Sequence, residues 1–179
     1  DDADADTSTP NDDERLVREL IAGQRTIAEV LSAVDRSGGF PVRTASGSFL
    51  FVHWASAGSW ALAGDFNAWA PEAMSAGDGF FWAEVAVPEP VGSGYKFVRD
   101  ATEWIADPWS RCYNYDSFGE LSYVQAPTAV PHLERWQGWP GAGILPRTVR
   151  IYVPAGAGPW PVLYMHDGQN LFDPNGMWG

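Results

Sequence analysis

The chain has 179 residues, of which 45% are hydrophobic and 14% aromatic. This is enough apolar material for one domain or two small ones, and it excludes a wholly disordered chain. The formal net charge is -12, and seven of the 23 acidic residues precede the first basic residue, Arg15. A single lysine, Lys96, and scattered arginines leave no basic surface for a phosphate backbone, so we expect no nucleic-acid partner.

A few features bear on the cellular compartment. Cys112 is the single cysteine, so no internal disulfide can form, and we expect a buried or half-buried thiol. No stretch reaches the roughly 18 apolar residues of a transmembrane helix, so no membrane span is predicted. The chain starts in a polar tract rich in Asp, Ala, Thr and Ser. This is typical of a secreted, periplasmic or lipid-tethered extracellular protein, although a chain trimmed at residue 1 would look the same.

The residue pattern near the N-terminus predicts a short tail followed by helices. Residues 1–13 combine acidic and small residues with little apolar surface, which predicts a flexible acidic tail. From Glu14 to Val34 apolar residues recur at helical spacing, and Gly23 interrupts the pattern. We therefore expect one or two amphipathic helices in a helical lead-in over residues 14–39, ended by the glycine pair Gly38-Gly39.

Beyond Phe40 the pattern changes to short segments rich in Phe, Val, Trp and Tyr, separated by Gly, Pro, Asn and Asp. This alternation is typical of a small β-sandwich. The candidate strands are residues 48–54, 59–64, 80–87, 94–99, 103–106 and 121–124, with turns at 67–71, 76–79, 88–93 and 107–110.

A domain boundary is predicted near residue 130. Residues 126–146 hold four prolines and three glycines, which indicates a surface linker. Residues 147–154 alternate with period two, as a strand with one exposed face does. Residues 161–165 read as a strand buried on both faces, of the kind found in parallel sheets, followed by a polar loop. In open α/β folds such a loop is where catalytic groups lie.

Three separated motifs carry a first resemblance. They are Gly-Asp-Phe-Asn-Ala-Trp at 64–69, Tyr-Lys-Phe-Val at 95–98 and Trp-Ile-Ala-Asp-Pro at 104–108. In this order they resemble the early-set immunoglobulin-like modules of glycogen-binding subunits and of branching and debranching enzymes, including isoamylase N-terminal domains. The likeness covers residues 40–125. It implies a sugar platform of Trp69, Lys96 and Trp104, whose indole faces and ammonium suit a pyranose.

Two observations keep a purely structural interpretation of that module open. Aromatic residues also supply the core area that a small sandwich needs. In addition, glycan-binding members carry an asparagine just after the glycine that follows Asp-Pro, whereas this chain has Gly119-Glu120. The platform then lacks an amide donor.

The second resemblance lies in the last part of the chain. Arg-Thr-Val-Arg-Ile-Tyr-Val-Pro at 147–154, followed by Pro-Val-Leu-Tyr-Met-His-Asp-Gly-Gln-Asn-Leu-Phe-Asp at 161–173, resembles the start of the α/β-hydrolase family that includes enterochelin and feruloyl esterases. The family implies a serine nucleophile in a Gly-x-Ser-x-Gly elbow, then an acid and a histidine. None of the three is found in the 179 residues, so no triad member is assigned here.

What the resemblance places in this chain is the oxyanion-hole region. The turn after the second strand matches the position from which α/β-hydrolases take one backbone N–H donor, here Gly168 or Gln169. His166, Asp167 and Asn170 are expected to form the pocket wall. His166 and Asp167 are adjacent in an extended segment and point in opposite directions, so they do not form a catalytic pair.

We predict no cofactor and no metal site, because the three histidines show no ligand spacing. The fold expected is mainly β, with short N-terminal helices, an immunoglobulin-like β-sandwich and the first strands of a truncated α/β-hydrolase sheet. The domains are a tail at 1–13, a helical lead-in at 14–39, the module at 40–125, a linker at 126–146 and an incomplete esterase domain at 147–179.

The leading hypothesis is the N-terminal portion of a serine carboxylic-ester hydrolase that is inactive alone. Its partners would be a small-molecule or sugar ester and the rest of its catalytic domain, in the same chain or a companion peptide. The sequence does not specify the ester. The alternatives are a carbohydrate-binding module for α-glucan or xylan, and a docking domain for a separate hydrolase chain.

Overall fold

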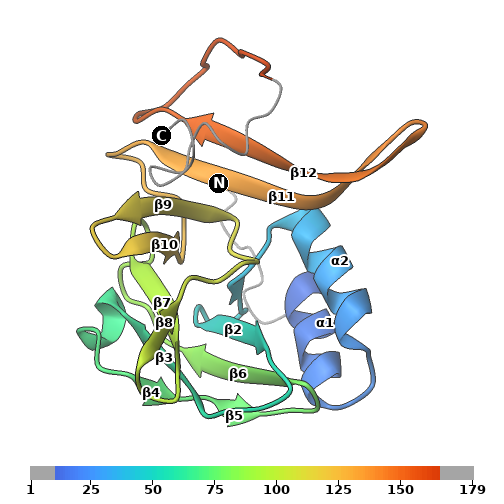
Figure 1. Cartoon of the computed structure of the whole chain (residues 1–179), viewed down its shortest axis with the longest axis vertical. Helices are drawn as coiled ribbons and strands as arrows, with labels where there is room; N and C mark the ends of the chain where they lie inside the picture. Colours follow the sequence, from blue (N-terminus) through green and yellow to red (C-terminus); the bar gives the residue numbers. More distant parts are fainter. Residues whose placement is uncertain (1–10, 166–179) are drawn as a thin grey trace, which may run out of the picture.

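The computed structural model describes residues 11–165 and is mainly β, with two short helices followed by two antiparallel sheets (Figure 1). The mainly β class with N-terminal helices is therefore as expected. The fold is compatible with the immunoglobulin-like module, whose assignment stays a prediction. None of the helices in residues 11–165 is long and apolar enough to cross a membrane.

The helices are α1 (Asp12–Ile21) and α2 (Ile27–Ser37). Asn11 caps α1, because its Oδ1 accepts a hydrogen bond from the backbone N of Glu14 at 2.7 Å. The first turn of α1 is acidic, which suits the positive end of a helix and lets it begin at Asp12, two residues before the helical pattern indicates. Gly23, at φ +72°, lies between the two helices, where the sequence places an interruption.

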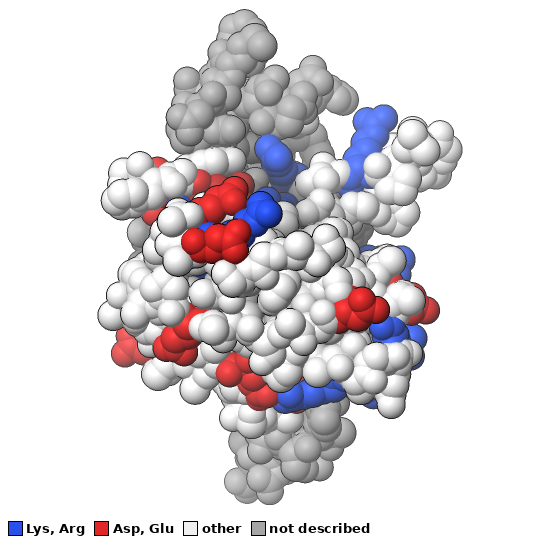
Figure 2. Space-filling model, turned by 60° about the horizontal axis from the view of Figure 1, so that its bottom comes forward, with Lys and Arg blue, Asp and Glu red and all other residues white. Residues whose placement is uncertain are grey.

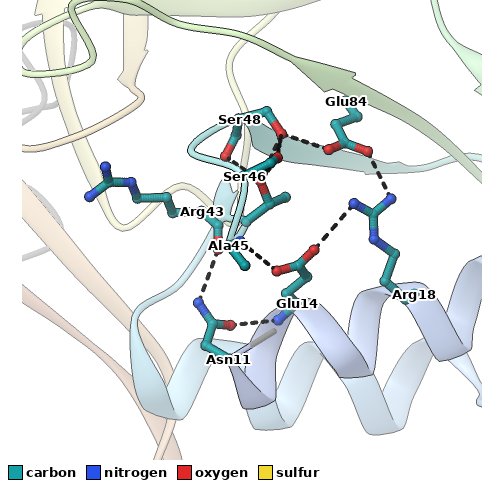
Figure 3. Close-up of polar contacts among 9 residues, drawn as sticks. Asn11, Glu14, Arg18, Arg43, Ala45, Ser46, Ser48 and Glu84 are labelled. Atoms are coloured by element: carbon teal, nitrogen blue, oxygen red, sulfur yellow. Dashed lines mark hydrogen bonds and ion pairs between the residues drawn. The ribbon is translucent and has the colours of Figure 1, made fainter. Parts of the chain in front are cut away.

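A buried carboxylate fastens α1 to the sandwich (Figure 3). Glu14 is 5% exposed, and its side chain accepts from the backbone N of Ala45 at 2.7 Å and from Arg18 at 3.2 Å. Arg18 also donates to Glu84 at 2.8 Å, and Glu84 accepts from Ser48 Oγ at 2.6 Å. This chain of charge-assisted hydrogen bonds joins the helix, the first hairpin and a strand of the first sheet.

The first sheet packs against the helices on one face and against the second sheet on the other, and α2 also contacts β11 (His132–Gly141) of the second sheet. Its strands, in spatial order, are β1 (Val42–Arg43), β2 (Phe49–Trp54), β6 (Phe80–Val85) and β5 (Ser75–Ala76). On β2, Leu50 and Val52 pack with the helices, whereas Phe49 and Phe51 pack toward the second sheet. Because both faces are covered, the four residues from Phe49 to Val52 are all apolar.

The second sheet is larger and runs β12-β11-β9-β10-β7-β3-β4, with β8 paired to β7. The bounds are β3 (Trp60–Gly64), β4 (Glu72–Ala73), β7 (Gly94–Arg99), β8 (Glu103–Ile105), β9 (Cys112–Asp116), β10 (Gly119–Tyr123), β11 (His132–Gly141) and β12 (Ile144–Val153), with a 3₁₀ turn η1 (Asp65–Asn67) after β3. Leu62, Tyr95 and Phe97 face the first sheet and complete the core between the sheets. All six strands predicted between residues 48 and 124 are present, with ends shifted by up to two residues.

The prediction of an unstructured linker at 126–146 is wrong in its secondary structure. β11 occupies ten residues of that stretch and pairs with both β9 and β12. The prolines do not prevent this, because Pro131 precedes the strand and Pro140 lies toward its exposed end, beyond a shift of register after Trp136. In Figure 1 the tip of this hairpin extends past α2.

The buried strand expected at residues 161–165 does not form. These residues have no regular structure, and Leu163 and Tyr164 are 80% and 90% exposed. A strand covered on both faces needs neighbouring strands and helices, and residues 11–165 offer it no pairing partner.

Candidate functional site

The turn after β3 places the first predicted platform residue. Asn67 Oδ1 accepts from the backbone N of Gly64 at 2.9 Å, and its Nδ2 donates to the carbonyl of Leu62 at 3.2 Å. Ala68 and Trp69 then adopt left-handed backbone conformations, with φ of 52° and 60°. Two consecutive non-glycine residues in this region are costly, so the surrounding hydrogen bonds must hold the turn in place.

Asp65 provides two of those hydrogen bonds. Its Oδ1 accepts from the indole Nε1 of Trp69 at 2.9 Å, and its Oδ2 accepts from the backbone N of Gly94 at 2.6 Å. Gly64 is needed because an added Cβ would lie 2.5 Å from the carbonyl oxygen of Gly94. The Gly-Asp-Phe-Asn-Ala-Trp motif therefore builds a rigid turn that fixes the Trp69 ring.

The structure brings Trp69 and Trp104 together. Their ring centroids are 6.2 Å apart and the planes are inclined by 45°. Trp104 is 45% exposed on β8, opposite Val98 of β7, and Trp69 is half-buried. An exposed indole beside a half-buried one is a suitable surface for stacking a sugar ring.

Lys96, the third predicted platform residue, is engaged by the protein itself. It lies on the same face of β7 as Val98, two residues away, and therefore on the face that carries Trp104. Its side chain is only 6% exposed, and Nζ donates to the carbonyl of Phe118 at 3.1 Å and lies 4.0 Å from Asp116 Oδ1. The ammonium stabilises the β9–β10 turn and offers little free donor capacity.

Glu120 stands where glycan-binding modules carry an asparagine. Its carboxylate accepts from the guanidinium of Arg135 on β11, an ion pair with Arg135 about 90% buried. Arg135 in turn stacks over the ring of Tyr113, 3.8 Å from its centroid. The position therefore fastens β11 to the sandwich, and the structure brings together the aromatic half of the predicted platform without its polar half.

The Asp-Pro motif forms a buried hydrogen-bond network around Asp107. Asp107 is 1% exposed, and its carboxylate accepts from the hydroxyl of Tyr95 at 2.7 Å and from the backbone N of Trp109 at 2.8 Å. The backbone N of Asp107 donates to Ser122 Oγ at 2.8 Å. Burial raises the pKa of Asp107 to about 6, partly offset by the bond from Tyr95. The motif ties β7 to β10 and faces the interior.

The charged surface shows no single dominant sign on the face in Figure 2, where acidic and basic side chains are interspersed among uncharged ones. His166, Asp167, Gly168, Gln169 and Asn170, the predicted oxyanion-hole region and pocket wall, lie outside the described residues.

One group of side chains that could bind a metal ion was not predicted from the sequence. Cys112, His132 and Glu134 present ligand atoms that all lie within 4.8 Å of one another. Their separation along the chain gives no recognisable motif, and only the pairing of β9 with β11 brings them together. A scan against protein-family models finds no match to this chain, and a search of curated proteins finds no relative.

Proposed function

We propose that this chain is the N-terminal portion of a serine carboxylic-ester hydrolase similar to enterochelin and feruloyl esterases. It supplies an accessory β-sandwich and part of the oxyanion-hole region, and the catalytic triad comes from elsewhere in the catalytic domain. The observation that carries the proposal is the ordered string from Arg147 to Asp173, a period-two strand followed by an apolar segment and the His-Asp-Gly-Gln-Asn loop.

The surface of the hairpin supports this proposal. Among the residues that the structure describes, β12 is the edge strand of its sheet, and Val149 and Ile151 are 39% and 40% exposed. The apolar segment at 161–165 is exposed as well. Edge strands and exposed apolar patches are normally covered in folded proteins, and further strands and helices of a hydrolase domain would cover both.

The proposed chemistry assigns one role to this chain. The serine hydroxyl from the elbow attacks the ester carbonyl, the alcohol leaves, and water then releases the acid from the acyl-serine. The backbone N–H of Gly168 or Gln169 donates to the oxygen that becomes negative. Losing one such donor lowers turnover by about 10²- to 10³-fold.

The test compares the 179-residue chain with the longest natural polypeptide that contains it. We expect the longer polypeptide to hydrolyse p-nitrophenyl acetate and the 179-residue chain not to. Replacement of the elbow serine by alanine should abolish the activity without loss of fold. An intact, folded longer protein with no hydrolysis of any aryl ester would overturn the proposal.

The paired indoles favour glycan binding as a second candidate function. Trp69 is held by a turn that is costly to form, and Trp104 exposes nearly half of its surface beside it. We expect saturable binding of an α-glucan or xylan, lost in Trp104→Ala. Trp139→Ala is the matched control, because Trp139 is similarly exposed at 48% but lies on β11. No binding at millimolar sugar, or equal loss in both variants, would remove this candidate.

A further inference from the structure

The pairing of β9 with β11 creates a cluster of three metal-ligating side chains. Cys112 at the start of β9 lies directly opposite Glu134 on β11, so the two side chains share one face of the sheet. His132 is two residues before Glu134 and therefore lies on that face too. A sulfur, a ring nitrogen and a carboxylate oxygen all fall within 4.8 Å of one another.

His132 has hydrogen-bonding capacity that the protein does not use. Its side chain is only 5% exposed, and among the described residues neither ring nitrogen has a hydrogen-bond partner. The nearest acidic oxygen, Glu134 Oε1, is 3.8 Å from Nε2, too far for a hydrogen bond. Buried polar groups are nearly always paired, so an unpaired imidazole beside a thiol and a carboxylate favours a binding site at this position.

We propose that Cys112, His132 and Glu134 bind a thiophilic divalent cation of the zinc class, with a fourth position open to water or another ligand. Thiolate, imidazole and carboxylate are established zinc ligands, at about 2.0 to 2.3 Å from the ion. The presence of sulfur and nitrogen selects zinc or cobalt over magnesium and calcium, which take oxygen ligands. This inference does not depend on the esterase proposal.

The surroundings provide the supporting interactions that a metal site needs. The indole Nε1 of Trp136 donates to Glu134 Oε2 at 3.3 Å, which leaves Oε1 as the oxygen facing His132. Cys112 also lines a cavity of about 500 Å³, of which His132 and Glu134 are not part. Tetrahedral coordination requires spacings of roughly 3.5 Å between ligand atoms, close to the 3.8 Å that already separates His132 Nε2 from Glu134 Oε1.

The local charge is compatible with a dication. On binding, the thiol proton of Cys112 leaves to solvent as the sulfur–metal bond forms, so thiolate and carboxylate together balance the two positive charges. Arg111 is the neighbouring cation. It stacks over Trp136, 3.6 Å from the ring centroid, and pairs with Asp35, which partly neutralises it.

Cobalt titration of the metal-free 179-residue chain tests the proposal. Thiolate coordination to cobalt gives a near-ultraviolet charge-transfer band that carboxylates of the acidic N-terminal residues cannot produce. We expect this band at one equivalent of cobalt, with tetrahedral visible bands, and its displacement by zinc. Cys112→Ser should abolish the charge-transfer band, and His132→Gln should weaken cobalt binding at least tenfold.

Glu134→Gln guards against a folding artefact, because the Glu134 side chain is 25% exposed and its replacement is isosteric. It should weaken cobalt binding at least tenfold while circular dichroism stays unchanged. Glu103→Gln, an exposed carboxylate on β8, is the matched control and should bind as the parent does. Absence of the charge-transfer band at millimolar cobalt in the folded chain, or equal affinity of Glu134→Gln and Glu103→Gln, would overturn the proposal.

Discussion

The side chains of the sandwich and those of the β11–β12 hairpin differ in how far they are paired or covered within the protein. In the sandwich, each conspicuous motif residue is paired internally: Asp65 with Trp69, Lys96 with Phe118, and Asp107 with Tyr95. In the hairpin, β12 exposes most of its length, and the apolar residues after it are exposed too. The contrast teaches that the sandwich motifs serve the fold first, whereas the hairpin and the segment after it present surface suited to being covered.

Asp107→Ala should have the largest effect on the free energy of unfolding, because it removes the centre of the buried hydrogen-bond network. The variant leaves the Tyr95 hydroxyl and the Trp109 backbone N–H without their acceptor. We expect the free energy of unfolding to fall by about 3 kcal/mol. Urea denaturation measures it, with the exposed carboxylate variant Asp116→Ala as control. Equal free energies of unfolding for the two variants would show that the hydrogen bonds of Asp107 do not stabilise the fold.

The pH dependence of the free energy of unfolding should show the contribution of His53, which packs between the sheets. Burial lowers the pKa of His53 from 6.5 to about 4. The neutral form is favoured in the folded state, so its contribution is present above pH 6.5 and is lost as pH falls toward 4. Asp107 has the opposite sign, because its raised pKa favours folding below pH 3.8 and the benefit is lost as pH rises to about 6.

His53→Gln should isolate the first of these contributions. Relative to the parent, the variant should lose about 2 kcal/mol less stability between pH 7 and pH 4.5, because one pKa unit corresponds to about 1.4 kcal/mol. Denaturant curves at both pH values measure the difference. Identical pH profiles for the two proteins would mean that His53 is readily protonated in the folded state.

Glu14→Ala should have an intermediate effect on the junction between α1 and the sandwich. It leaves the Ala45 backbone N–H unpaired and removes one partner of Arg18, so we expect a loss of about 1 to 2 kcal/mol. Glu19→Ala on the same helix is the control, because it removes only solvent-screened ion pairs with the exposed Arg15 and Arg25, so the loss should be smaller. A larger loss in the control would contradict the role given to Glu14.

Val149→Thr on the exposed edge strand should have the smallest effect. The residue is 39% exposed, and threonine keeps the β-branched shape, so the free energy of unfolding should change by less than about 0.5 kcal/mol. Chemical denaturation measures this. A loss above 2 kcal/mol would mean that β12 belongs to the packed core, and the contrast between hairpin and sandwich would fail.

The strands of the sandwich could be predicted because local residue pattern determines them. β7, for example, has the bounds expected from its aromatic and β-branched residues Tyr95, Phe97 and Val98. β9 was missed because Cys-Tyr-Asn-Tyr-Asp has polar residues typical of turns, and it becomes a strand through pairing with β10 and β11. β11 is not predicted because the prolines and glycines of residues 126–146 favour a linker.

Of the candidate site, the sequence could predict residue types but not their partners. The meeting of Trp69 with Trp104 follows from the resemblance, whereas the capture of Lys96 by the carbonyl of Phe118 depends on a turn 22 residues away. The cluster of Cys112, His132 and Glu134 depends on strand register. Register is a property of the folded sheet, so residue spacing alone could not reveal it.

The most direct test of the esterase proposal is the intact mass of the longest natural polypeptide containing these residues, before and after reaction with a serine-directed fluorophosphonate. We expect a mass above the 19.6 kDa of the present chain and a single adduct on the serine of a Gly-x-Ser-x-Gly elbow. A folded polypeptide that takes up no adduct would contradict the proposal.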